Sequence, residues 1–176
     1  MIILGIDPGT AITGYGVIKT VSRSLRKGSG ILWVEHGTIT TPKNTPNHER
    51  LLLLERGLNR LFKKHKPELL CVERLYFFKN AKTALPVSEA RGVILLLAAK
   101  HKILLQELAP QQAKMAVTGY GKAEKLQVQR MVQRILGLEA LPRPDDAADA
   151  LALAIAASIL TLHHSFHGEG LTRETK

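Results

Sequence analysis

Two short apolar runs that each end in an acidic residue constrain the fold most strongly. Residues 2–6 are apolar or glycine and lead into Asp7, and residues 69–72 are apolar and lead into Glu73. Runs of this length without alternating polar residues are typical of strands that are buried on both faces. They predict neighbouring central strands of an α/β domain.

The remaining patterns predict a meander of antiparallel strands at the N-terminus, followed by alternating helices and strands. The order βββαβαβααα implies a three-layer α/β/α domain with one five-stranded mixed sheet. Pro86 predicts a kink or a boundary in its helix. We expect one domain over residues 1–164 and a flexible tail over residues 165–176. The predicted strands are 2–7, 13–20, 31–40, 69–73 and 103–108, and the predicted helices are 47–65, 80–100, a short segment after Pro110, 123–136 and 146–164.

The net charge of +10 on 176 residues favours a polyanionic partner such as nucleic acid, although a merely basic protein is the alternative. Cys71 is the single cysteine and lies in an apolar run, which predicts a buried structural thiol and fits a reducing cytoplasm. The N-terminal apolar stretch lacks a preceding basic region, and the Ala/Leu-rich stretch 147–162 is too short to span a bilayer. We therefore expect a cytoplasmic protein without a membrane partner.

Asp7 and Glu73 end their predicted strands at the carboxyl side, where ligands gather in open α/β sheets. If the strands are parallel neighbours, the two carboxylates face one crevice. Each residue alone has a simpler explanation. Asp7 could start a turn before Pro8 and Gly9, and Glu73 could be an exposed residue at a strand edge.

A second pair of acids, Asp146 and Asp149, stands three residues apart at the start of a predicted helix. Both point from one face of the first turn, and the helix N-terminus stabilises their charge. Asp145 or Asp146 could instead be the helix N-cap. Capping does not explain Asp149 among alanines and leucines, and a buried carboxylate there should meet a cation.

Together these four carboxylates are hard oxygen ligands, without cysteine or paired histidine support. This composition suits Mg²⁺, with Mn²⁺ as a substitute, rather than zinc. Two such ions can activate a water and stabilise the leaving oxygen in phosphodiester cleavage. His163, His164 and His167 are a much weaker zinc candidate, because no carboxylate pattern accompanies them.

Three lysines in the C-terminal half could hold phosphates. Lys114 lies on the short helix, and Lys122 and Lys125 follow a glycine-rich loop at the start of the next helix. The alternative is a solvated basic face.

An aromatic segment directly follows Glu73. Aromatic rings interleaved with lysine and asparagine are suited to stacking on unpaired bases, and the alternative is a hydrophobic anchor for the next helix. The segment comprises Tyr76, Phe77, Phe78, Lys79 and Asn80.

These residues belong to an ordered set of motifs over residues 2–157. The set resembles the RuvC family of Holliday junction resolvases, and in its full order it is highly specific. The motifs are GIDPG at 5–9, TGYGV at 13–17, VE at 72–73, KNA at 79–81, EARG at 89–92, AEK at 123–125 and DAADAL at 146–151.

The resemblance implies a ribonuclease-H-like fold, a homodimer, and Mg²⁺-dependent symmetric nicking of a four-way DNA junction. It also implies the RuvA–RuvB branch-migration complex as a partner. The four acids match the family's metal-binding carboxylates, and Lys114 and Lys125 match its catalytic-site lysines. Tyr76 stands where the family usually has a base-stacking phenylalanine. Two further departures leave the acids untouched: Ala11-Ile12 replaces a charged or polar pair, and Pro86 interrupts a usually regular helix.

Three other functions share parts of this pattern. An ATPase or sugar kinase of the actin type also opens with a motif like Asp7-Pro8-Gly9-Thr10, but it needs two such domains. A non-catalytic junction-binding module needs the lysines and aromatic residues but not four acids. A ribonuclease-H-like nuclease that acts on RNA could carry a similar set of acids.

Overall fold

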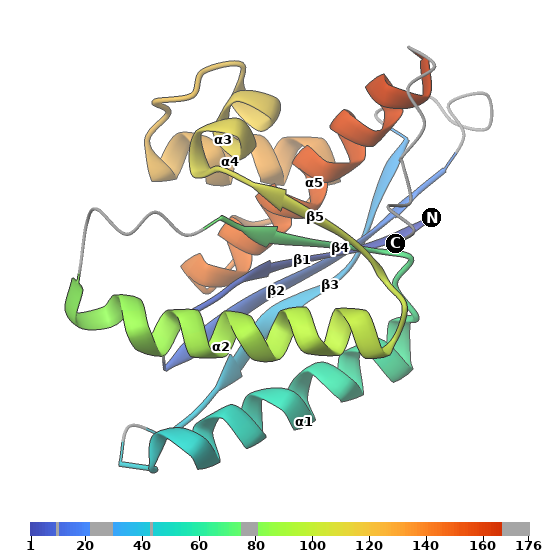
Figure 1. Ribbon diagram of the computed structural model, residues 1–176. Helices are drawn as coiled ribbons and strands as arrows, with labels where there is room; N and C mark the ends of the chain where they lie inside the picture. The colour runs from blue at the N-terminus through green and yellow to red at the C-terminus, as the bar shows by residue number, and fades with distance from the viewer. Residues whose placement is uncertain (10, 22–29, 43, 75–80, 167–176) are drawn as a thin grey trace.

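A five-stranded mixed sheet forms the middle layer of the protein, with the strand order β3-β2-β1-β4-β5 (Figure 1). The computed structural model describes residues 1–9, 11–21, 30–42, 44–74 and 81–166, and only the backbone of 81–83 and 162–166. β2 pairs antiparallel with β1 and β3, whereas β4 runs parallel to both β1 and β5. The strands are β1 (Ile2–Asp7), β2 (Ile12–Thr20), β3 (Ile31–Thr40), β4 (Leu69–Glu73) and β5 (Leu104–Leu108).

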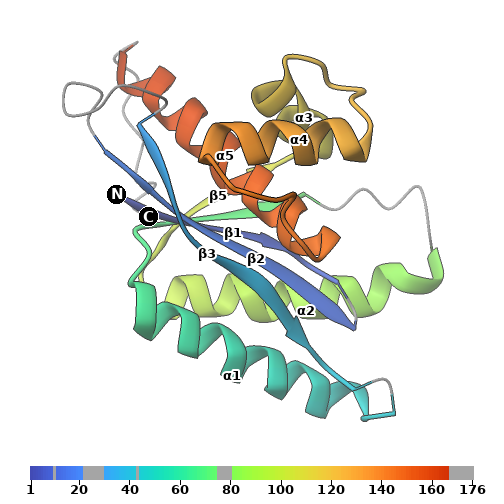
Figure 2. The same ribbon diagram turned by 180° about the vertical axis from the view of Figure 1, so that it is seen from behind.

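Helices cover both faces of this sheet and complete the three layers. Figures 1 and 2 show α1 and α2 on one face and α3, α4 and α5 on the other. The predicted element order and the α/β/α architecture are therefore confirmed. The helices are α1 (Asn47–His65), α2 (Ala81–Lys100), α3 (Pro110–Thr118), α4 (Lys125–Leu136) and α5 (Asp145–Phe166).

The central strands are buried on both faces, as their apolar runs predicted. Successive side chains of a strand point to opposite faces of the sheet. Ile3 and Cys71 thus join the core beneath α5, and Leu4 and Leu70 join the core beneath α1 and α2. Cys71 is fully buried, and burial raises the pKa of its thiol to about 12, which fits a structural role.

Several element boundaries differ from the predicted ones. α2 continues through Pro86, so the predicted boundary is wrong. Pro86 lies inside α2, in its second turn, so its missing N–H costs one intrahelical hydrogen bond without ending the helix. α4 begins at Lys125 rather than at residue 123, because the Gln127 side chain accepts a hydrogen bond from the Glu124 backbone and caps the helix there.

The C-terminal helix is longer than predicted and runs from Asp145 to Phe166. The rest of the predicted tail, residues 167–176, lies outside the described residues. Among the helices that the structure describes, none is long and apolar enough to cross a membrane.

Candidate active site

Asp7 and Glu73 end adjacent parallel strands. Ile6 of β1 lies opposite Val72 of β4, so the two acids that follow stand side by side at the same end of the sheet. Both belong to the alternation that includes Ile3 and Cys71, and they therefore face the α5 side. The predicted parallel pairing of these strands is confirmed, and it places both carboxylates at the same end and on the same face of the sheet.

The first turns of α5 lie unusually close to the strands on this side. A Cβ atom on Gly14, which lies opposite Asp7, would collide with the backbone carbonyl of Asp146. A Cβ atom on Gly5 would likewise collide with the carbonyl of Ala150. Because both positions are glycine, the helix backbone can rest directly on β1 and β2, which brings the acids of α5 to the end of β1.

Asp149 meets a cation, as its place among apolar residues predicted. The Nζ atom of Lys125, the first residue of α4, lies 3.2 Å from Oδ2 of Asp149. The same Nζ atom lies 3.5 Å from Oδ2 of Asp145. One lysine therefore bridges two carboxylates of α5.

Neither Asp145 nor Asp146 is the N-cap of α5, which was one of the predicted alternatives. Both residues belong to the first helical turn. The residue before them, Pro144, accepts hydrogen bonds at its carbonyl from the backbone N–H groups of Ala147 and Ala148. Capping consequently accounts for neither acid.

A cavity of about 230 Å³ opens between β4, α3, α4 and α5. Its polar lining consists of two predicted acids, Glu73 and Asp149, and two predicted lysines, Lys114 and Lys125. The volume corresponds to several water molecules, each of which takes about 30 Å³ in the liquid, and so accommodates a phosphate group or a hydrated ion. Asp7 and Asp146 are not among the residues that line it.

Lys114 also fixes the chain on the far side of this cavity. Its Nζ atom donates a hydrogen bond to the carbonyl of Ala123 at 2.8 Å. Ala123 lies just before α4, so Lys114 ties α3 to the segment that leads into Lys125. This link between the two lysines was not predicted from the sequence.

The acids shift one another's protonation. Burial, followed by the charges of Glu73, Asp149 and Asp146, raises the pKa of Asp7 to about 7. Burial and the charge of Asp149 also raise the pKa of Glu73, although Lys114 opposes this. Burial raises the pKa of Asp149 against the lowering effect of Lys125. Burial is the largest cause of each shift, and the charges of neighbouring acids add to it.

The chemistry of the donor atoms shows whether the residues fit a divalent metal ion. The donors are all carboxylate oxygens, which hard cations prefer, and a bound cation would relieve the repulsion that raises the pKa of Asp7. Within the part of the chain that the structure describes, no three carboxylate, imidazole or thiolate side chains are close enough to surround one ion. The donor chemistry fits a hard metal ion, and in the structure one oxygen of Asp149 is paired with Lys125.

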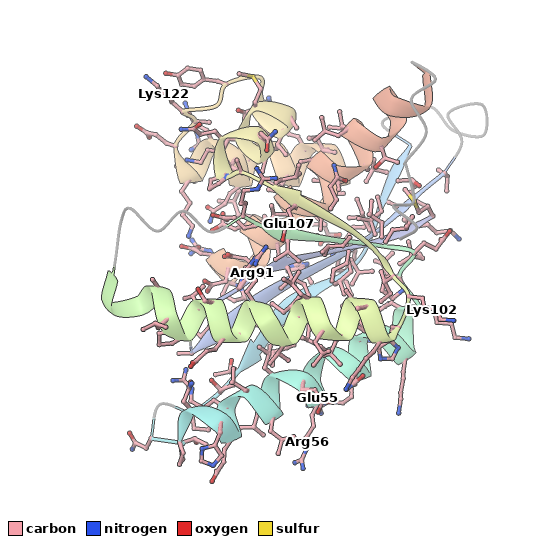
Figure 3. All side chains as sticks on the ribbon, in the orientation of Figure 1. Glu55, Arg56, Arg91, Lys102, Glu107 and Lys122 are labelled. Atoms are coloured by element: carbon pink, nitrogen blue, oxygen red, sulfur yellow. The ribbon has the colours of Figure 1, made fainter. Side chains whose placement is uncertain are left out.

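The other predicted binding residues either lie away from the cavity or belong to segments that the structure does not describe. Lys122 is exposed in the loop between α3 and α4 and points outward (Figure 3). The segment Tyr76, Phe77, Phe78 and Lys79-Asn80 lies outside the described residues, as do His167 and the side chains of His163 and His164.

An ion pair joins α2 to the sheet next to the site. Figure 3 shows Arg91 of α2 and Glu107 of β5 pointing toward one another, and their guanidinium and carboxylate groups are paired. Glu107 lies opposite Val72, the residue before Glu73. The pair thus fixes the helix that follows the aromatic segment against the strand beside Glu73.

Comparison with known proteins identifies the family. Residues 3–157 match the family model described as crossover junction endodeoxyribonuclease RuvC. The chain belongs to the RuvC family. The RuvC of Ruminiclostridium cellulolyticum is 50% identical over 155 residues, which cover 88% of this chain and 90% of that protein. The RuvC of Fusobacterium nucleatum is 46% identical over 155 residues, covering 88% of this chain and 78% of that protein.

Solved structures of RuvC support the same assignment. Thermus thermophilus RuvC in complex with Holliday junction substrate has a TM-score of 0.85 at 30% identity, covering 94% of this chain and 97% of that chain. The yeast mitochondrial Holliday junction resolvase shares the fold, with a TM-score of 0.64 at 16% identity over 93% of this chain and 83% of that chain. The ribonuclease-H-like fold is confirmed.

Membership of the RuvC family removes the actin-type ATPase as an alternative. The structure also shows residues near the site that the sequence patterns missed. Asp145 was considered only as a helix cap, yet it shares Lys125 with Asp149. Gly14 lay within a RuvC motif, but nothing in the sequence predicted its contact with Asp146.

Proposed function

We propose that this chain is a metal-dependent endonuclease that resolves four-way DNA junctions by paired, symmetric nicks. The observation that carries the proposal is the convergence of acids from β1, β4 and α5 beside Lys114 and Lys125, in a chain of the crossover junction endodeoxyribonuclease family. Acids at this position suit phosphodiester hydrolysis, because the reaction needs both an activated water and a stabilised leaving oxygen.

Asp7, Glu73, Asp146 and Asp149 would hold Mg²⁺, with two ions in each site and Mn²⁺ as a substitute. When bound, the ions supply an activated water and charge stabilisation at the phosphate. The charge coupling between Asp7 and the other three acids supports a shared role for the set. Asp146 lies in the first turn of α5, where the helix N-terminus favours negative charge.

The lysines would neutralise the scissile phosphate and hold it against the acids. Lys114 and Lys125 line the same cavity as Glu73 and Asp149. A phosphate in this cavity would therefore lie between the lysine ammonium groups and the carboxylates. Lys122, exposed in the neighbouring loop, would contact the DNA backbone farther from the cut. The net charge of +10 supports attraction of DNA over a longer range.

The segment after Glu73 would contact unpaired bases at the junction centre. Its composition supports stacking, with Tyr76, Phe77 and Phe78 followed by Lys79 and Asn80. The segment connects β4, which carries Glu73, to α2. Base contacts there would fix which phosphate reaches the acids.

A homodimer would supply the second cut. α2 exposes Leu85 and Leu96, which are 73% and 55% accessible, and Gly92 between them has no neighbour within 4 Å of a Cβ position. The adjacent edge strand β5 exposes Leu104 and Leu105. An apolar stripe with a small residue at its centre suits close packing against a second copy, and a two-fold axis matches two symmetric cuts.

The enzyme would act in the cytoplasm on junctions prepared by the RuvA–RuvB complex. Family membership supports this partner, and a single buried cysteine suits a reducing compartment. Residues 1–164, together with the last two residues of α5, would form the nuclease domain.

Cleavage of defined substrates tests the proposal. The protein is incubated with a synthetic four-way junction, a linear duplex and an RNA–DNA hybrid, each with Mg²⁺ or EDTA. We expect paired nicks in the junction alone, abolished by EDTA and by Asp7→Asn but not by Glu139→Gln, an exposed acid on the segment after α4. Preferred cleavage of the hybrid would instead support a nuclease that acts on RNA.

A further inference from the structure

Asp145 is the most heavily bonded of the acids at the start of α5. Its Oδ1 atom accepts a hydrogen bond from Nε2 of Gln129 at 3.0 Å, and Nη1 of Arg143 lies 3.4 Å from the same oxygen. Its Oδ2 atom faces Nζ of Lys125 at 3.5 Å. Gln129 is only 5% accessible, so the carboxylate is held from a buried anchor. Asp145 therefore presents one oxygen to Lys125 in a fixed direction.

Lys125 divides its charge between two acids that have different surroundings. Its Nζ atom is closer to Asp149, at 3.2 Å, than to Asp145, at 3.5 Å. Asp149 lines the cavity with Glu73, whereas Asp145 is not among the lining residues. A movement of Nζ away from Asp149 thus leaves Asp145 as a partner outside the cavity.

We propose that Asp145 is a positioning residue that keeps Lys125 beside the site while Asp149 exchanges this lysine for a divalent metal ion. In the metal-free protein Lys125 neutralises Asp149, and on metal binding it stays on Asp145, close to the bound phosphate. The inference rests on the proposed function, because it assumes that Asp149 binds the metal.

The competition follows from charge. Two cations beside one carboxylate repel each other, so a divalent cation at Asp149 weakens the contact between Nζ of Lys125 and Oδ2 of Asp149. With Asp145 present, the displaced lysine keeps an ion pair. Without Asp145, the displaced lysine loses this second ion pair, and the metal binds more weakly.

A double-mutant cycle on metal affinity tests this mechanism. Binding of Mn²⁺ to the DNA-free, EDTA-treated protein is measured by calorimetry for the wild type, Lys125→Met, Asp145→Asn and the double variant. Both side chains are about half exposed, at 51% and 45%, so the substitutions leave the core intact. Because exposed ion pairs are weak, we expect Lys125→Met to tighten Mn²⁺ binding by about two- to fivefold.

Asp145→Asn should weaken Mn²⁺ binding by about twofold in the wild-type background and have no effect in the Lys125→Met background. The same loss in both backgrounds would show that Asp145 acts by its own charge and would overturn the proposal. Unchanged or weaker binding by Lys125→Met would also overturn it. If the wild-type protein cleaves junctions only with metal but the variants give either of these results, the proposed function stands. Only the positioning role of Asp145 is then wrong.

Discussion

Gly14 of β2 lies directly against the backbone carbonyl of Asp146 in α5. This contact sets the distance between the sheet and the helix at the point where acids from both elements meet, since Gly14 is also the register partner of Asp7. Any side chain at this position must push α5 away from the strand. The geometry of the site thus depends on a residue that carries no functional group.

Gly14→Ala should therefore destabilise the fold and abolish cleavage. The added methyl group collides with helix backbone, which cannot yield as a side-chain end can. We expect the free energy of unfolding to fall by about 3 kcal/mol, at the upper end of the range for overpacked cores. Urea denaturation measures the loss. Gly121→Ala is the matched control, because its Cβ would meet other atoms at an ordinary 3.4 Å. Equal stability of the two variants would show that α5 can shift freely.

Asp7→Asn should remove activity while stabilising the metal-free protein at neutral and higher pH. The pKa of Asp7 is raised from 3.8 to about 7 by burial and by the neighbouring acids. Since the folded-state pKa lies above the unfolded value, its stabilising contribution is complete below pH 3.8 and is lost as the pH rises through about 7. Burial of the charged form is costly, so the variant should gain about 1–3 kcal/mol over the wild type near pH 8.

The measurement for this variant is thermal or urea unfolding in EDTA across that pH range. The wild type should lose stability relative to Asp7→Asn as the pH rises. Parallel pH profiles for the two proteins would mean that Asp7 ionises in the folded state without penalty, and would argue against a shared negative site.

Lys125→Ala should slow junction cleavage more than it weakens junction binding. Lys125 lines the cavity beside Asp149, whereas Lys122 lies in the exposed loop. We expect a drop of about 10²-fold in the single-turnover rate at saturating enzyme, the range seen when a group that stabilises charge in the reaction is removed. Lys122→Ala should instead reduce affinity and lower the salt dependence of binding by about one phosphate contact. Equal losses of rate and affinity for Lys125→Ala would mean that Lys125 only binds a phosphate and does not assist the reaction.

Leu96→Glu should convert the protein to a monomer. Leu96 is 55% accessible on α2 and lies on the stripe that we propose as the dimer face. A buried charge without a partner would separate the subunits, while the fold of each remains intact. Analytical ultracentrifugation measures the state, and the junction assay should show that the two nicks no longer occur together. Leu52→Glu, at a position of α1 that is 46% accessible, is the control and should leave the dimer unchanged.

The strands and the paired acids were predictable because strands that are buried on both faces have continuous apolar sequences. Residues 2–6 and 69–72 could only be strands covered on both faces, and their parallel pairing then placed Asp7 beside Glu73. The amphipathic helix patterns fixed α1 and α4 to within a few residues. The cation beside Asp149 was predicted from its apolar surroundings, but its identity as Lys125 was not.

The details that could not be predicted depend on contacts between distant segments. The glycines of β1 and β2 gave no indication of which helix they would meet, because any close element satisfies the same pattern. The link from Lys114 to Ala123 and the bridge from Lys125 to Asp145 depend on side-chain direction in three dimensions. The helix boundary predicted at Pro86 was wrong, because one missing backbone N–H does not end α2.

The placement of α5 also bears on how the protein is made. Its acids come from the last helix that the structure describes, whereas β1 and β4 are synthesised much earlier. Contacts between such distant segments form late, since the intervening chain must first be ordered. A nascent chain that has extended only through α4 carries Asp7 and Glu73 without Asp146 and Asp149. The acids that we propose as metal ligands therefore come together only after α5 has been synthesised and has packed onto the glycines of the sheet.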